Sequence, residues 1–146
     1  MHDLLTSAKN KLTEGGYTCV ILSEGREYSS RDRGVKPLIT LLESGESFAG
    51  AFAADKTVGA GAAHLYVLIG VGALWANVIS VSAKQILEAN GIDVYYRECV
   101  SYIINRQGDG ICPIEYAVRD AKDSREAYRS ILDALAKLSK TSVNNR

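Results

Sequence analysis

The densest group of reactive side chains in this 146-residue chain lies in the segment NRQGDGICPIE, residues 105–115. Cys112 stands directly before Pro113, and proline is favoured at the first position of a helix. The sequence therefore predicts a short helix that begins after Cys112. A cysteine at a helix N-terminus near a cation such as Arg106 is favoured as the thiolate, the form that acts as a nucleophile or sulfur carrier.

Two glycines in the same segment favour a tight turn. Such a turn would fold Asn105 and Arg106 back towards Cys112. Glu115, if it faces the same point, would serve as a proton carrier. A structural role is the alternative, in which Cys112 is a small buried cap and Arg106 pairs with a carboxylate. Cys112 and Glu115 are thus candidate catalytic residues, and Asn105 and Arg106 are candidate ligand contacts.

A second candidate site follows the apolar run at 48–54, which is typical of a strand buried on both faces. Asp55 and Lys56 come next, and small residues with helical spacing follow them. We expect both at the carboxyl end of the strand, where open α/β sheets bind ligands. Lys56 suits an anion or a carbonyl group, and Asp55 suits proton transfer or a simple helix cap. Gly59, which lets the backbone approach closely, is assigned to ligand binding.

A third group of charges lies in the loop SSRDRGVKP, before a helix predicted over 35–43 with Pro37 in its first turn. Arg33 and Lys36 therefore stand at a helix N-terminus, where free N–H groups and the helix dipole favour an anion. Phosphate binding is one interpretation. A solvated charged loop is the other, since runs of charge are usually exposed.

Two familiar motifs are not matched by this sequence. The run GAGAA lacks the acidic residue about 20 positions later that a dinucleotide-binding GxGxxG motif requires. His2 and His64 stand alone, and no CxxC or HxxxH spacing would make a zinc site. We therefore expect no metal and no cofactor.

The charge balance limits the classes of partner. Seventeen lysines and arginines offset seventeen aspartates and glutamates, whereas a nucleic-acid or membrane-surface partner usually requires a positive excess. No apolar run reaches the roughly 18 residues of a membrane-spanning helix, and the N-terminus lacks a signal-peptide pattern. The three cysteines are odd in number and widely spaced, which suits reduced thiols. We expect a cytoplasmic protein with a small-molecule partner, and neither a nucleic-acid nor a membrane partner.

Helical and strand patterns alternate along the chain, which predicts one α/β domain over 1–146 with its core at about 17–120. The expected architecture is a three-layer αβα sandwich with a mixed sheet. Trp75 and the tyrosines suit either the core or a contact in a homo-oligomer. The predicted elements are a helix at 3–12, strands at 17–22 and near Tyr28, a helix at 35–43, a strand at 48–54 with its helix, a strand at 74–79, a helix from Ser82, a strand at 92–98, a helix at 124–138 and a disordered tail at 141–146.

The order of these elements, with the strings ADKTVG and INRQGDGICPIE, resembles a small group of uncharacterised bacterial proteins of the cytidine-deaminase-like fold. The resemblance covers about 17–120 and implies a ligand crevice at the ends of the middle strands. Zinc deaminases of this fold carry His-x-Glu or Cys-x-Glu at one helix start and Pro-Cys-x-x-Cys at the next. Here those places read DKT at 55–57 and SVSA at 80–83, which offer no such ligands.

We therefore expect a deaminase-like protein without zinc that binds a small anionic or nucleotide-like ligand. One hypothesis is a zinc-independent enzyme in which Cys112 is the nucleophile or sulfur carrier. Lys56 and Arg106 would then hold charge, while Asp55 or Glu115 moves protons. The other hypothesis is a non-catalytic binding or regulatory module that uses the same crevice.

Overall fold

The computed structural model describes residues 1–105 and 107–144, with side chains as far as residue 139. Helices and strands alternate from 36 to 117, as the hydrophobic patterns predicted, whereas two strands at 19–30 and two helices at 113–144 are consecutive. The elements are α1 (Asp3–Gly15), β1 (Cys19–Ser23), β2 (Arg26–Ser30), α2 (Lys36–Ser44), β3 (Phe52–Val58), α3 (Ala60–Ile69), β4 (Ala73–Ser80), α4 (Val81–Ala89), β5 (Asp93–Val100), α5 (Pro113–Ala117) and α6 (Ser124–Asn144).

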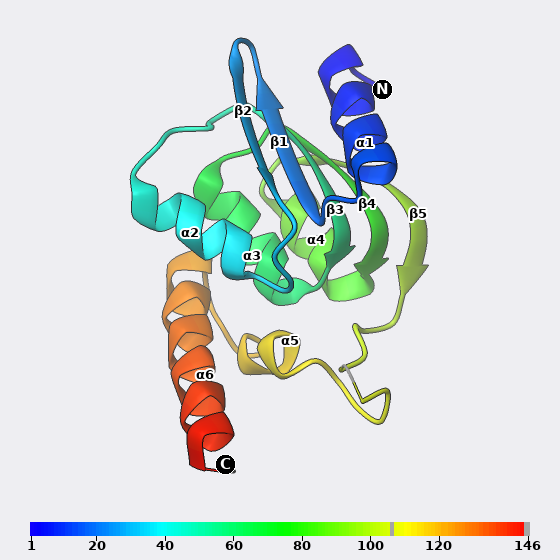
Figure 1. Cartoon of the computed structure of the whole chain (residues 1–146). Helices are drawn as coiled ribbons and strands as arrows, with labels where there is room; N and C mark the ends of the chain where they lie inside the picture. Colours follow the sequence, from blue (N-terminus) through cyan, green and yellow to red (C-terminus); the bar gives the residue numbers. More distant parts are fainter. Residues whose placement is uncertain (106, 145–146) are drawn as a thin grey trace.

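The strands form one mixed sheet in the order β2-β1-β3-β4-β5 (Figure 1). Strand β1 pairs antiparallel with both β2 and β3. Strands β3, β4 and β5 run parallel, and α3 and α4 connect them. The carboxyl ends of β3 and β4 therefore lie at the same edge of the sheet, beside the first turns of α3 and α4. This confirms the prediction of an α/β fold with a mixed sheet.

Helices flank the sheet on both faces, and each face has its own apolar core. On one face α1 buries Leu5, Ala8 and Leu12 against Val20 and Trp75. On the other face α3 is almost wholly buried beneath α2, α4, α5 and α6, as its apolar composition requires (Figure 1). Among the described residues, no helix combines the length and apolar character that a bilayer crossing requires.

The boundaries of the central strand differ from the prediction. The expected strand at 48–54 is shifted, since β3 is Phe52–Val58 and Asp55 lies in its middle rather than at its end. Residues 48–51 form a loop in which Gly50 adopts a φ of 78° and donates a hydrogen bond to the Gly70 carbonyl. A charged residue inside a strand gives no apolar signal, so the polar pair Asp55 and Lys56 was interpreted as a helix start.

Two helix ends also differ from the prediction. Helix α4 is capped by Ser80, whose hydroxyl oxygen accepts a hydrogen bond from the Ala83 amide at 3.2 Å, and not by Ser82. Helix α6 continues to Asn144, beyond the predicted end at 138 and into the segment expected to be disordered. Positions 145 and 146 lie outside the described residues.

Close packing of α3 against α5 depends on Gly61. A Cβ atom at this position would stand 2.6 Å from Cγ2 of Ile114, well inside the ordinary carbon–carbon contact distance. Gly61→Ala is therefore expected to lower the free energy of unfolding by about 1 kcal/mol, because overpacking exceeds the gain in helix propensity. In an Ile114→Ala background the same change should be stabilising. Urea titration of wild type, Gly61→Ala, Ile114→Ala and the double variant measures these free energies of unfolding. An equal effect of Gly61→Ala in both backgrounds would contradict the packing explanation.

Candidate functional site

The carboxylate of Glu115 lies between the first turns of α3 and α4, at the carboxyl ends of the central strands. Its Oε1 accepts a hydrogen bond from the Ser82 hydroxyl at 3.2 Å, and its Oε2 accepts one from the Ile103 amide at 2.5 Å. The Glu115 residue is only 7% exposed. Buried carboxylates require such donors, so α5 is fixed to α4 and to the segment after β5.

Gly59 lies next to this carboxylate and precedes the first residue of α3. A Cβ atom at Gly59 would stand 3.1 Å from Cγ1 of Ile103 and 3.5 Å from the carboxyl carbon of Glu115. The absence of a side chain therefore lets Glu115 approach the start of α3. Sequence reasoning assigned Gly59 and Glu115 to one crevice, and the structure brings these two together.

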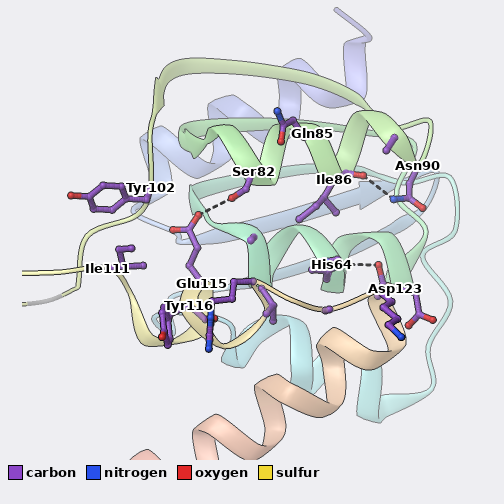
Figure 2. A pocket seen from close by; sticks show the side chains of 17 residues that line it. His64, Ser82, Gln85, Ile86, Asn90, Tyr102, Ile111, Glu115, Tyr116 and Asp123 are labelled. Atoms are coloured by element: carbon purple, nitrogen blue, oxygen red, sulfur yellow. Dashed lines mark hydrogen bonds between the residues drawn. The ribbon is translucent and has the colours of Figure 1, made fainter.

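A groove of about 780 Å³ opens beside Glu115. Its walls are α3, α4, the residues after β5 and the segment from α5 to the start of α6 (Figure 2). At one end Tyr102, Ile111 and Tyr116 surround Glu115, and these three residues are 43–53% exposed. Figure 2 shows the Glu115 side chain pointing from α5 towards Ser82 on α4. This end combines exposed apolar surface with the buried carboxylate of Glu115 and the half-buried hydroxyl group of Ser82.

The other end of the groove contains His64 of α3. Its Nδ1 lies 2.9 Å from the hydroxyl of Ser124, at the start of α6 (Figure 2). Burial lowers the pKa of His64, and the charge of Asp123 opposes this shift. Arg119 and Lys122 also line the groove. Polar and cationic groups are thus spread along its length.

Asp55 lies apart from this groove, in a buried network beneath α3. The Tyr66 hydroxyl donates to Oδ2 of Asp55 at 2.5 Å, and the Thr57 amide donates to Oδ1 at 3.1 Å. The sulfur of Cys19 lies 3.3 Å from the same Tyr66 oxygen. Cys19 and Asp55 face each other across β1 and β3, which places both on the α3 side of the sheet.

Burial sets the titration behaviour of this network. It raises the pKa of Asp55 from 3.8 to about 7, although hydrogen bonds from Tyr66 and from the Thr57 and Lys56 amides act in the opposite direction. Burial also raises the pKa of the Tyr66 hydroxyl and of the Cys19 thiol, and the charge of Asp55 adds to both shifts. Asp55 therefore changes charge near neutral pH inside the core.

The other predicted site residues lie at several separate places. Lys56 is exposed on β3 beside Asp55. Cys112 is partly exposed at the start of α5, and its amide donates to the Ile103 carbonyl at 2.8 Å. Asn105 stabilises its own turn, because its side-chain oxygen accepts hydrogen bonds from the amides of Gly108 and Asp109.

Arg33 and Lys36, which were predicted to bind an anion, are exposed near the start of α2. Neither Arg33 nor Lys36 is among the residues that line the groove. Arg106 lies outside the described residues. The structure therefore brings Gly59 and Glu115 together, and it places Asp55, Asn105 and the α2 residues in other surroundings.

A zinc ion of the deaminase kind does not fit the donors present at the two helix starts. Because β3 extends to Val58, the helix start after it reads Gly59, Ala60 and Gly61, and not DKT at 55–57. The next helix start offers serine hydroxyls in place of thiolates. No group of three or more His, Cys, Asp or Glu side chains within the described part of the chain is arranged to hold a metal ion.

Sequence reasoning missed three residues that the structure places at polar contacts. The sequence placed Ser82 only at a helix start, gave Tyr66 no role apart from the other tyrosines, and singled out His64 only as a histidine without metal-binding partners. Ser80 and Ser82, which lie 3.3 Å apart through their hydroxyl oxygens, follow a strand predicted to be buried. That position, directly after a central parallel strand, was the one available signal for a ligand contact.

The fold and the groove define an α/β protein with a groove, lined by both apolar and polar side chains, at the carboxyl ends of its central strands. The chain belongs to the TM1506 family, described as a domain of unknown function (DUF1893), whose family model matches residues 7–135. A crystal structure of a DUF1893 family protein (TM1506) from Thermotoga maritima at 2.70 Å resolution is similar to this chain. The two are 28% identical with a TM-score of 0.83, over 91% of this chain and 90% of that one. No functionally curated protein matches the sequence.

Proposed function

We propose that this protein is a cytoplasmic, three-layer αβα protein of the cytidine-deaminase-like kind that binds a nucleotide-like ligand in the groove beside Glu115. The fold assignment is supported by the mixed sheet and by the position of the groove at the ends of its middle strands. Such crevices are where open α/β sheets bind ligands. The groove volume of about 780 Å³ suits a mononucleotide, since small-molecule pockets are typically ~300–1,000 Å³.

The observation that carries this proposal is the buried carboxylate of Glu115. It accepts one hydrogen bond from Ser82 and one from Ile103, whereas an ionised carboxylate has about four acceptor positions. The remaining positions suit the N–H groups of a ligand. A base with an exocyclic amino group, such as cytosine, supplies such a donor, while the carbonyl oxygen of uracil at the same place would be repelled.

The residues around Glu115 suit the rest of a nucleotide. Tyr102 and Ile111 offer exposed apolar and aromatic surface for the face of a base. Arg119 lies over the ring of Tyr116 at 3.7 Å, and Lys122 lines the same groove. These two cations would bind a phosphate group. The ligand would therefore extend from the Glu115 end, with its base there and its phosphate towards Arg119 and Lys122.

The position of Cys112 favours a ligand-binding role over a catalytic role in which Cys112 is the nucleophile. The groove is lined by the neighbouring Ile111, whereas Cys112 is not among its lining residues. We therefore propose a ligand-binding or regulatory role, and Cys112→Ala should leave ligand affinity unchanged within about twofold.

Calorimetric titration with CMP and UMP tests this function. The two probes are similar in size. Cytosine carries an amino group at C4 and an unprotonated N3, whereas uracil carries a carbonyl group at C4 and an N–H group at N3. We expect CMP to bind at least about tenfold more tightly than UMP, because losing one hydrogen bond to a charged acceptor costs ~1.5–3 kcal/mol. Tyr102→Ala, a change at an exposed residue, should weaken CMP binding by a similar factor.

Two results would contradict the proposal. Equal affinity for CMP and UMP would show that Glu115 does not accept a hydrogen bond from the amino group of the base. If inorganic phosphate binds as tightly as CMP, the groove recognises only an anion and not a nucleotide base. Leu138→Lys, a change at an exposed residue of α6 outside the groove, serves as the matched control and should bind CMP normally.

A further inference from the structure

Strand β5 forms an unpaired edge of the sheet. One side of it pairs with β4, and within the described part of the chain no strand pairs with its other side. Figure 1 shows β5 at the outer margin of the sheet. The strand is 8 residues long, longer than the usual ~5–6. A long exposed edge offers a row of free N–H and C=O groups to another strand.

The side chains of this edge are aromatic as well as charged. Tyr95 and Tyr96 are each 41% exposed. Tyr95 pairs in register with Trp75 on the α1 face, and Tyr96 lies on the α4 face, 5.9 Å from Lys84 Nζ measured to its ring centre. Arg97 shares the face of Tyr95, because alternate residues of a strand point the same way. The two faces of the edge therefore each present an exposed tyrosine.

The backbone direction of each residue follows from one hydrogen bond. The Asp93 amide donates to the Gly72 carbonyl at 3.2 Å, so it points towards β4. Because backbone groups alternate in direction along a strand, Tyr96 and Glu98 point their N–H and C=O groups towards the open edge, as does Val94. A second strand can therefore form hydrogen-bonded pairs at these three positions.

We propose that β5 pairs antiparallel with β5 of a second copy of this chain, with Tyr96 opposite Tyr96 at a two-fold axis. Val94 then forms a hydrogen-bonded pair with Glu98 of the second copy, and the reverse pair forms by symmetry. Tyr95 faces Arg97 of the second copy in a non-hydrogen-bonded pair, where side chains lie closest. Each such pair places a guanidinium group against an aromatic ring. The two five-stranded sheets become one continuous sheet.

The charges and the length of the strand favour this register over its neighbours. Moving the axis to Arg97 would place two arginines directly opposite each other, which is destabilising. Moving the axis to Tyr95 would leave residues 98–100 opposite residues 90–92, all of which precede β5. The register centred on Tyr96 pairs residues 93–99 of both copies. It therefore uses nearly the whole edge and creates no like-charge pair across the axis.

Sedimentation at a series of protein concentrations tests the pairing. We expect the wild-type protein to show a reversible monomer–dimer equilibrium. Tyr96→Lys places two positive charges opposite each other at the axis and should raise the dimer dissociation constant at least about tenfold. Leu138→Lys is the matched control at an exposed residue of α6 and should keep the wild-type equilibrium. A wild-type protein that stays monomeric at all concentrations, or a dimer unchanged by Tyr96→Lys, would overturn the proposal.

Cross-linking tests the register separately. In a protein that carries Cys99→Ser and Cys112→Ser, with the buried Cys19 retained, Tyr96→Cys should give a disulfide-linked dimer under mild oxidation. Facing hydrogen-bonded residues have Cα atoms about 5.5 Å apart, within the range of a disulfide. Glu98→Cys in the same background should not cross-link, because its two copies would lie roughly 14 Å apart. Equal cross-linking at both positions would overturn the register.

Discussion

Replacing Asp55 by asparagine is expected to remove most of the dependence of folding stability on pH between about pH 4 and pH 7. Burial raises the pKa of this carboxyl group from 3.8 to about 7 in the folded protein. Above pH 3.8 the unfolded chain releases this proton, whereas the folded protein retains it up to about pH 7. The stabilisation from Asp55 is therefore complete below pH 3.8 and is lost as the pH rises towards 7.

The expected size of this effect is large for a single residue. A difference of about three pKa units corresponds to roughly 4 kcal/mol of unfolding free energy. Urea titrations of both proteins across this pH range, at one protein concentration, measure it. Relative to wild type, Asp55→Asn should gain roughly 4 kcal/mol between pH 4 and pH 7. Curves for the two proteins that run parallel with pH would contradict a buried, titrating Asp55.

Tyr66→Phe gives a second test of the network of Asp55, Tyr66 and Cys19, because the direction of its effect on the pKa of Asp55 is known. The Tyr66 hydroxyl donates to Asp55 and lowers the pKa of that carboxyl group. Removing the hydroxyl group should raise the pKa of Asp55 further, so that stability declines over a higher pH range. A shift of the decline to lower pH would be inconsistent with this hydrogen bond.

Glu115→Ala is expected to lower the free energy of unfolding by about 2–4 kcal/mol. The carboxylate is the buried acceptor for both the Ile103 amide and the Ser82 hydroxyl. Truncation to alanine leaves these two donors without that acceptor in a largely buried place. It also removes the connection that fixes α5 to α4 and to the segment after β5.

Thermal and urea unfolding of Glu115→Ala measure this loss directly. Glu14→Ala, at the exposed end of α1, is the matched control and should change stability by less than about 0.5 kcal/mol. A loss as small for Glu115→Ala as for the control would show that the buried carboxylate does not hold the helix starts together.

The general architecture could be predicted because it depends on local patterns. Strands at 17–22 and near Tyr28 were predicted from β-branched and aromatic residues around a polar turn, and β1 and β2 form there as an antiparallel pair. The start of α5 after Cys112 was confirmed and followed from Pro113. These features are determined by residues that are neighbours in sequence, so one chain is sufficient to identify them.

The position of the site could be predicted only in part, because it depends on contacts between distant segments. Buried Asp55 is stabilised by a hydrogen bond from Tyr66, a residue of the following helix. Its position was therefore predicted at the end of the strand, whereas it lies in the middle of β3. Glu115 was identified as a reactive type, yet its partners Ser82 and Ile103 are separated from it by 33 and 12 positions. The hydrophobic periodicity of the sequence does not identify which hydrogen-bond donors will contact a buried carboxylate. The groove also includes Ser124 at the start of α6, a helix that the sequence predicted at 124–138 without relating it to the site.

The central claim, that the groove beside Glu115 binds a nucleotide-like ligand, is tested most directly by mapping amide chemical-shift changes on titration with CMP. The predicted result is a set of changes at the starts of α3 and α4, at 102–103 and along 115–122, which surround the groove. The basic residues Arg33 and Lys36 at the start of α2 should be unaffected. Changes confined to the start of α2, or no changes near Glu115 at saturating CMP, would contradict the account.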